Sequence, residues 1–190
     1  VIFTMLLALG SYTACAEGFS FHADAGMATM PNSDIWNTGI TLRGTGFNTI
    51  LENHPNLRLG LGLGISWFGL NEDELLAEYG SLVGEASGHA FIMEIGPTLR
   101  YETEKKSGFD YFGEIGLGYT KIWGSTTVDA SYSGWSFDAT DDFDWDDTGL
   151  SIGGGIILWN KLEIKPEYHM ILDTDDSDYF TLTAGLVFGK

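Results

Sequence analysis

Apolar and polar residues alternate with a period of two along most of the chain. In the clearest run, 58–68, leucines such as Leu59 and Leu61 occupy one set of positions, and glycines such as Gly60 and Gly62 occupy the other. This period places all the apolar side chains on one face of a β-strand. The pattern predicts eight strands, at 19–27, 39–43, 58–68, 91–101, 111–120, 150–158, 162–172 and 180–188. Pro97 and Pro166 fall on apolar faces, where we expect bulges.

The connections between these strands differ in length. Short ones fall at 30–36, 103–108, 160–161 and 173–178, a medium one at 48–56, and long ones at 70–88 and 124–147. Strands of roughly ten residues joined in this way are typical of outer-membrane barrels, with short periplasmic turns and longer outer loops. The sequence therefore predicts an all-β, eight-stranded antiparallel up-and-down transmembrane β-barrel with a side-chain-filled lumen. Hairpin order puts 30–36, 70–88, 124–147 and 173–178 outside.

Two arrangements of the faces are open, because a soluble barrel points its apolar face inward and a membrane barrel points it outward. The polar face is rich in Gly, Ser and Thr with few lysines, which suits a narrow lumen. Aromatic residues gather near both strand ends, as at two membrane interfaces. They are Trp36, Trp67, Phe68, Tyr119, Trp123 and Phe180 on the loop side and Phe19, Tyr101, Phe109, Tyr111 and Phe188 on the turn side. These features favour the membrane barrel; a soluble lipocalin-like lipid carrier is the alternative.

The first residues indicate export. An apolar run at 1–10 is too short to span a bilayer, and Ala14-Cys15-Ala16 has the small-x-small form of a cleavage site. We therefore expect residues 1–16 to be a truncated secretory signal peptide and 17–190 to be the barrel. The other interpretation makes Cys15 a lipidated cysteine.

Composition narrows the possible functions. The 190 residues carry 27 acidic and 9 basic side chains, a net charge of -18. Nucleic-acid binding needs cations that neutralise phosphates, so we do not expect this chain to bind nucleic acid. A hydrophobic content of 44% excludes a disordered acidic tail. A single cysteine provides neither an intramolecular disulfide nor a zinc cluster.

The export signal, the eight alternating strands and the run Thr183-Ala184-Gly185-Leu186-Val187-Phe188 resemble one family. This is the small eight-stranded outer-membrane β-barrel family of the OmpA-transmembrane, OmpX and opacity-protein type. The resemblance implies residence in the outer membrane of a Gram-negative-type bacterium. It also implies contact with outer-membrane lipids and lipopolysaccharide, and a family whose members anchor, adhere, evade host defence or, less often, modify lipids.

Charged residues on the polar face should meet inside the barrel. They are Asp24, Arg43, Glu94, Arg100, Glu114, Lys165 and Glu167. A buried charge is costly unless it is paired, so we predict a salt-bridge network around Arg43, with Asp24 and either Glu114 or Glu167 among its partners. Such a network would plug an eight-stranded lumen; a gated ion or proton path is the alternative.

The outward loops hold most of the acidic residues. Oxygen ligands suited to calcium occur in two runs, at Asp141, Asp142, Asp144 and Asp146 and at Asp173, Asp175 and Asp176. The other interpretation is a solvated, mutually repulsive surface without bound calcium. Apart from this possible calcium site, we expect no cofactor.

Within loop 124–147, apolar and polar residues alternate on both sides of Ser133-Gly134, which is a hairpin turn signal. Two strands should therefore extend beyond the membrane. Tyr132, Trp135 and Phe137 would lie on that ribbon, where exposed aromatic rings and unpaired strand edges can bind a partner. In loop 70–88, Asn71 followed by acidic residues predicts a short helix.

We therefore expect a monomeric barrel with a structural or adhesin-like surface-interaction role and an extracellular surface ligand. The alternative class is a lipid-modifying outer-membrane enzyme, because Ser151, His169 and Glu167 share the lumen face. The sequence shows no further catalytic motif, so we expect no enzyme.

Overall fold

The computed structural model describes residues 18–51, 53–79, 83–103, 108–132, 135–172 and 177–189. The expected signal peptide, 1–16, lies outside these residues. So do three of the expected calcium ligands, Asp173, Asp175 and Asp176.

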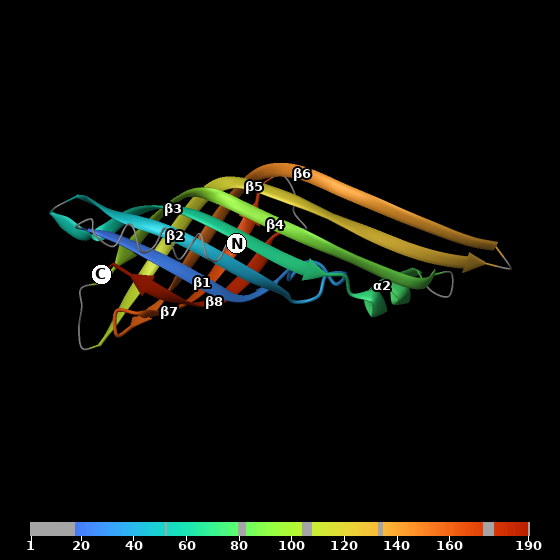
Figure 1. Cartoon of the computed structure of the whole chain (residues 1–190), viewed down its shortest axis with the longest axis horizontal. Helices are drawn as coiled ribbons and strands as arrows, with labels where there is room; N and C mark the ends of the chain where they lie inside the picture. Colours follow the sequence, from blue (N-terminus) through green and yellow to red (C-terminus); the bar gives the residue numbers. More distant parts are fainter. Residues whose placement is uncertain are drawn as a thin grey trace.

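The eight described strands form a closed barrel in sequence order, each antiparallel to its neighbours (Figure 1). They are β1 (Phe19–Thr29), β2 (Gly39–Leu51), β3 (His54–Gly69), β4 (Val83–Glu102), β5 (Phe109–Tyr132), β6 (Trp135–Leu158), β7 (Leu162–Ile171) and β8 (Tyr179–Phe188). Pairing of β1 with β8 closes the ring. The predicted fold class is confirmed.

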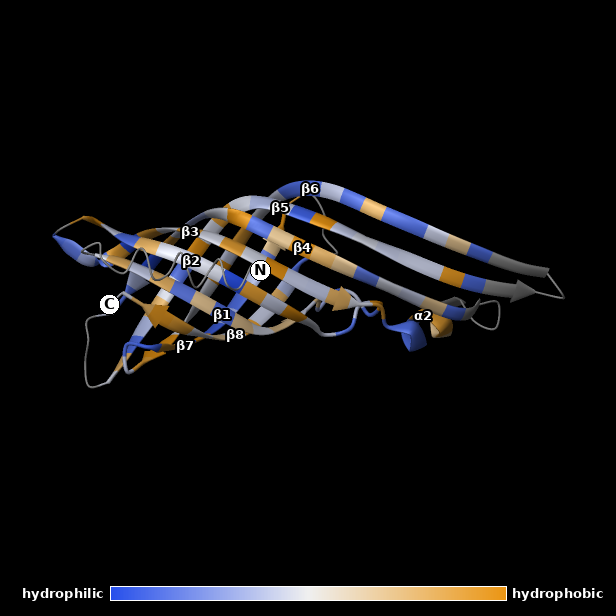
Figure 2. Ribbon diagram, viewed as in Figure 1, coloured by the Kyte–Doolittle hydropathy of each residue, from blue (hydrophilic) through white to orange (hydrophobic). Residues whose placement is uncertain are grey.

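The apolar face of the barrel points outward. Leu61 and Met27 are each 61% exposed, and Leu117 is 52% exposed. Arg100 and Glu167, in contrast, are 1% exposed in the interior. Figure 2 shows the resulting alternation of hydrophobic and hydrophilic residues along the barrel strands. The soluble lipid-carrier alternative is wrong, because it requires the leucines to converge on the barrel axis.

Three strands, β4, β5 and β6, continue beyond the barrel at one end (Figure 1). β4 begins at Val83, although the sequence predicts its start at 91. β5 ends at Tyr132, and β6 begins at Trp135. The predicted extension of β5 and β6 is thus confirmed. β4 joins it because Ser87 and Gly88 pair with Thr127 and Thr126 of β5. We call this β4–β5–β6 extension, at 83–90, 124–132 and 135–147, the outer sheet.

The expected helix of loop 70–88 is present as α2 (Glu72–Tyr79), with three acidic residues in its first turn. Leu75 of α2 packs with Leu70 and with Ala86 of the outer sheet, and Val128 lies against this cluster. α2 therefore covers part of one face of the outer sheet near the barrel mouth. In the part of the chain that the structure describes, no helix has the length and apolar character needed to cross a membrane.

The sequence predicts bulges at the two prolines, but the strands have no bulge at either position. Pro97 pairs with Leu61 of β3, and Pro166 pairs with Leu182 of β8, both in unshifted register. The strand on the other side of each proline skips its pairing there and resumes in the same register. A proline lacks only its own N–H, so these ladders lose pairing on one side without an inserted residue.

Most of the predicted aromatic girdle residues face outward, but two do not. Trp67, Tyr119, Tyr101 and Tyr111 are each more than 40% exposed. Phe68 is fully buried, and Trp36 packs against the same buried cluster. Because Phe68 occupies the inward parity of β3, it belongs to an apolar cluster at the loop end of the lumen. That cluster comprises Ala28, Met30, Phe68, Ala90, Ile92, Ile122, Ile171 and Tyr179.

Candidate functional site

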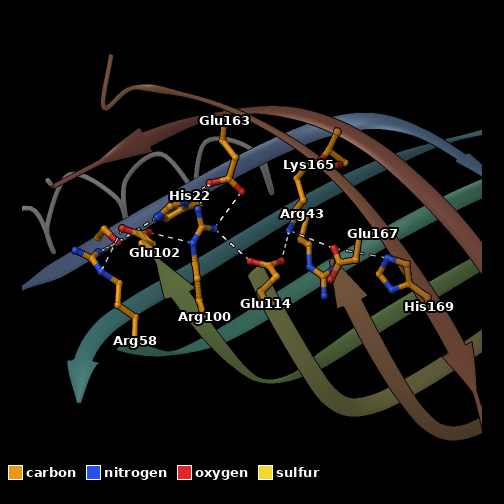
Figure 3. Close-up of polar contacts among 12 residues, drawn as sticks. His22, Arg43, Arg58, Arg100, Glu102, Glu114, Glu163, Lys165, Glu167 and His169 are labelled. Atoms are coloured by element: carbon orange, nitrogen blue, oxygen red, sulfur yellow. Dashed lines mark hydrogen bonds and ion pairs between the residues drawn. The ribbon is translucent and has the colours of Figure 1, made fainter. Parts of the chain in front are cut away.

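Arg100 of β4 lies at the centre of a buried ion-pair network in the lumen (Figure 3). Its guanidinium donates to Glu163 at 2.7 Å and to Glu114 at 3.2 Å. Its Nε lies 3.0 Å from a carboxylate oxygen of Glu102. The guanidinium also stacks over the ring of Phe112, 3.5 Å from the ring centroid. Only a permanently charged, planar group can meet three carboxylates and an aromatic face in this way.

A second group of charges lies toward the loop end. Arg43 of β2 donates to Glu167 of β7 and lies 3.7 Å from Glu94 of β4. Lys165 lies 3.2 Å from Glu167 and donates to Glu114 at 2.7 Å. Because Glu114 accepts from both Arg100 and Lys165, it connects the two groups into one network (Figure 3).

Asp24 departs from the predicted pairing. It faces the same interior at 5% exposure, but neither of its carboxylate oxygens has a hydrogen-bond partner among the described residues. Its register partner Arg43 points instead toward the carboxylates of Glu94 and Glu167. Asp24 lies against Gly185 of β8, where a Cβ would collide with its carboxylate. The expectation that Arg43 pairs with Asp24 is therefore wrong, and Arg100 has more carboxylate partners than Arg43.

Glycines make room for these long side chains. A Cβ at Gly153 would lie 3.1 Å from the Cγ of Glu167, and one at Gly60 would lie 2.6 Å from the ring of Phe47. A cavity of about 20 Å³ remains beside Arg43 and Thr120, which is space for about one water molecule. Apolar clusters lie at both ends, with Phe112 at the turn end. Side chains thus fill the described lumen.

The residues considered for catalysis are part of this filling. The Nδ1 atom of His169 lies 2.9 Å from Glu94, its Nε2 atom lies 3.3 Å from the hydroxyl of Thr181, and its ring stacks on Tyr179. Ser151 pairs with His169 across the β6–β7 ladder, and both are buried. Both side chains are therefore packed among the other residues of the lumen.

Several network members were missed by the sequence reasoning. Glu163 accepts from Arg100 and lies 2.7 Å from Nδ1 of His22. Glu102 lies 3.7 Å from Nε of Arg58, on the turn side of the network. Strand parity was the signal that could have found them, because all four residues alternate with outward apolar residues on their strands.

The outer sheet carries acidic residues on an open face. On β6, Asp138, Thr140, Asp142, Asp144 and Asp146 share one face, and all are exposed. On the same face of β5, Lys121 lies 2.7 Å from Asp144. Across the ladder, Thr127 and Thr140 share a hydrogen bond at 3.2 Å. Beyond the ion pair with Lys121, this face presents carboxylates to solvent.

The outer edge of β6 has no neighbouring strand over most of the outer sheet. Within the described residues, β7 pairs with β6 only over Gly149–Leu158, whereas β5 pairs with β6 as far as Trp135. The side chains of Tyr132, Trp135 and Phe137 lie outside the described residues, although the backbone pairs Tyr132 with Trp135. The proposed aromatic contacts of these three residues stay a prediction.

The expected calcium ligands of β6 are not gathered into a metal site. No group of three or more His, Cys, Asp or Glu residues is placed to hold a metal ion within the described ranges. In β6, Asp141 points to the opposite face from Asp142, Asp144 and Asp146, because alternate residues of a strand face opposite ways. Any contribution from 173–176 lies outside the described residues.

Comparisons with known proteins bear on the fold. No protein-family model and no curated protein matches the chain. Among solved structures, Neisserial surface protein A is 15% identical with a TM-score of 0.51, and the match covers 92% of this chain and 98% of that one. A major outer membrane protein from Thermus thermophilus is 12% identical, also with a TM-score of 0.51, over 90% of this chain and 98% of that one. The chain therefore has the fold of the small eight-stranded outer-membrane β-barrels.

Proposed function

We propose that this protein is a surface-binding protein of the outer membrane of a Gram-negative-type bacterium. The barrel anchors the outer sheet, and the outer sheet binds an extracellular ligand. The observation that carries the proposal is the continuation of β4, β5 and β6 beyond the barrel with one edge of β6 unpaired among the described residues. Exposed strand edges of this kind are templates for binding another chain.

The lumen supports an anchoring role over a transport role. Ion pairs of Arg100 and Lys165 cross the interior, and apolar clusters lie above and below them. Opening a path would separate buried charges, which costs several kcal/mol for each pair. The barrel wall meanwhile presents an apolar belt to outer-membrane lipids, including the lipid portion of lipopolysaccharide.

One similar structure is called a surface protein in its own name, Neisserial surface protein A. A surface location suits the present chain as well, because its charged, projecting sheet needs an aqueous surrounding. The net charge of -18 keeps such a surface soluble.

The test removes the outer part of the sheet and keeps the barrel. Thr126 of β5 pairs with Asp141 of β6, so residues 127–140 can be replaced by Asn-Gly, a two-residue hairpin turn. Cells that display this variant should lose adhesion to host cells or extracellular matrix. The matched control, Ser133→Asn, introduces the same Asn-Gly turn with the full-length strands and should adhere normally.

Both variants should show a mobility difference between boiled and unboiled samples on a denaturing gel, which verifies a folded barrel. Adhesion of the shortened variant at the wild-type level would contradict the proposed function.

A further inference from the structure

The free edge of β6 has a defined set of exposed backbone groups. The carbonyl of Thr148 accepts from the N–H of Leu172, on the side away from β5. The N–H of Thr148 donates to the side chain of Asp147. Because N–H and C=O directions alternate along a strand, every second residue from Thr148 toward the tip points these groups at the free edge. Those residues are Asp146, Asp144, Asp142, Thr140 and Asp138.

The same residues also place their side chains on one face, since side chains alternate with the same period. Four of the five are aspartates, and all five are exposed. Among the described residues, Lys121 of β5 lies beside them just below the outer sheet and pairs with Asp144. The sequence contains no Lys or Arg from 124 to 159. Among the described residues, the free edge therefore combines unpaired backbone groups with a row of carboxylates that has one lysine, Lys121, beside Asp144 and Asp146.

The intervening residues of β6 face the other way and are mainly apolar near the barrel. Phe143 packs edge-on against Trp36 at 6.2 Å and lies 5.2 Å from Trp145, measured between ring centroids. Trp145 is 36% exposed. A strand added at this edge would place alternate side chains beside the aspartates and the others near Trp145.

These features select among possible occupants of the edge. A second copy of β6 would bring aspartates next to aspartates, and like charges on adjacent strands are destabilising. An acidic partner would be repelled for the same reason. A basic strand gains both ladder hydrogen bonds and charge pairing.

We propose that the free edge of β6, over Asp138–Asp146, binds an extended segment of a partner protein in which basic residues alternate with apolar ones. The segment adds to the outer sheet as a further strand. Its basic side chains lie beside Asp138, Asp142 and Asp146, and its apolar side chains lie on the face of Phe143 and Trp145. This inference rests on the proposed function and names the chemical class of its partner.

The probe is a fluorescently labelled peptide in which lysine and valine alternate, long enough to span Asp138–Asp146. Binding to the full chain in lipid nanodiscs is followed by fluorescence anisotropy. Two control peptides contain the same residues with all lysines in one block, or glutamate in place of lysine. The alternating peptide should bind at least about tenfold more tightly than the block peptide, because only alternation matches the strand period. Its affinity should fall as salt is added.

Two variants separate the backbone contribution from the charge contribution. Thr140→Pro keeps every carboxylate and removes one edge N–H, at an edge position where proline is tolerated. It should weaken binding about tenfold or more, since a central ladder bond is lost and the ring obstructs the added strand. Thr127→Val is the matched control, because it removes the same Thr127–Thr140 hydrogen bond and leaves the edge intact; it should bind as wild type.

The triple variant Asp138→Asn, Asp142→Asn, Asp146→Asn tests the charge. It preserves the Lys121–Asp144 pair and should weaken binding about tenfold, with a smaller salt dependence. Hydrogen exchange adds a direct readout: the N–H groups of Thr140, Asp142 and Asp144 should exchange more slowly when the peptide is bound.

Equal binding of the alternating and block peptides, or unchanged binding by Thr140→Pro, would overturn strand addition. If neither the alternating nor the block lysine peptide binds, the basic-partner inference is overturned. The adhesion assay of the variant with residues 127–140 replaced is independent of these peptide measurements. If that variant loses adhesion while the peptide results are negative, the proposed function stands, but with a different ligand.

Discussion

β5 and β6 run through two environments, the barrel and the solvent-exposed outer sheet. Comparing their acidic residues in these two regions shows what decides the role of each charge. Within the barrel, Glu114 of β5 is 6% exposed and is bonded to two cations from other strands. In the outer sheet, Asp142 and Asp146 of β6 are exposed, and the edge beside them lacks a strand within the described residues. The alternation of residues is the same in both regions. What differs is whether the surrounding medium forces each charge to find a partner.

This difference separates two roles for acidic residues. A buried carboxylate in the lumen must be paired, so the network fixes the relative positions of β2, β4, β5 and β7. An exposed carboxylate is stabilised by water and remains available to an external cation. The lumen network is therefore a structural element, and the exposed carboxylates of the outer sheet belong to the region that we propose binds a ligand.

The largest expected effect is the loss of the central cation of the lumen, Arg100. If the barrel tolerated this loss, the contrast between buried and exposed charges would be wrong. Arg100→Met should lower the free energy of unfolding by about 3–5 kcal/mol, because it leaves the carboxylates of Glu163 and Glu114 buried without that partner. Urea unfolding in lipid vesicles, followed by tryptophan fluorescence, measures this change. Lys121→Met removes the exposed pair with Asp144 and should change the unfolding midpoint very little. Similar losses for both variants would show that burial is not the deciding factor.

Two positions on the outward face of β5 test which part of that face contacts lipid. Ile115 and Thr127 share the outward face of β5, the first midway between Tyr111 and Tyr119 and the second in the outer sheet. Ile115→Arg should cost about 2–4 kcal/mol, the range for a cation near the bilayer midplane. Thr127→Arg, on the same face in water, should be nearly neutral. The same unfolding assay compares them, and an equal cost at both positions would contradict the assignment of the apolar belt to lipid.

The filled lumen predicts little ion flow. Single-channel recordings of the purified barrel in planar bilayers should show no large, steady conductance, because Arg100, Lys165 and their carboxylate partners occupy the interior. A porin of known conductance, reconstituted in the same way, is the positive control. A steady open state would mean that the network is a gate and not a plug.

Calcium should have the smallest effect. The described aspartates of β6 do not converge on a metal, so the melting temperature should change equally with calcium and with magnesium. A ligand that binds only the folded state raises the melting temperature with concentration. A calcium-specific rise would therefore indicate a site, and its loss on deletion of 173–178 would assign that site to the loop outside the described strands.

The barrel was predictable because the strand period is visible in the sequence. Runs such as 58–68 predict both the strand and its outward face, and the structure confirms each. The prediction failed at Phe68, since an aromatic residue near a strand end looks the same whether it faces lipid or the barrel mouth. The length of β4 was also missed, because 83–90 contains two glycines and no strict alternation of apolar residues.

The charge network was less predictable in its pairings. Parity identifies which residues face the lumen, including Glu163, which sequence reasoning left out of the network. It does not tell how far a long side chain reaches across the interior. Arg43 thus passes over its register partner Asp24 and contacts Glu94 and Glu167 instead.

The most direct test of the inside-out arrangement uses nitroxide spin labels at Leu61 and at Asp142, each introduced through a single cysteine in a background in which Cys15 is absent. The account predicts that oxygen, which concentrates in lipid, relaxes the label at Leu61 more than a water-soluble nickel complex does, and that the order reverses at Asp142. An immobile label at Leu61 reached by neither reagent would contradict the account, because it would place that leucine inside the barrel.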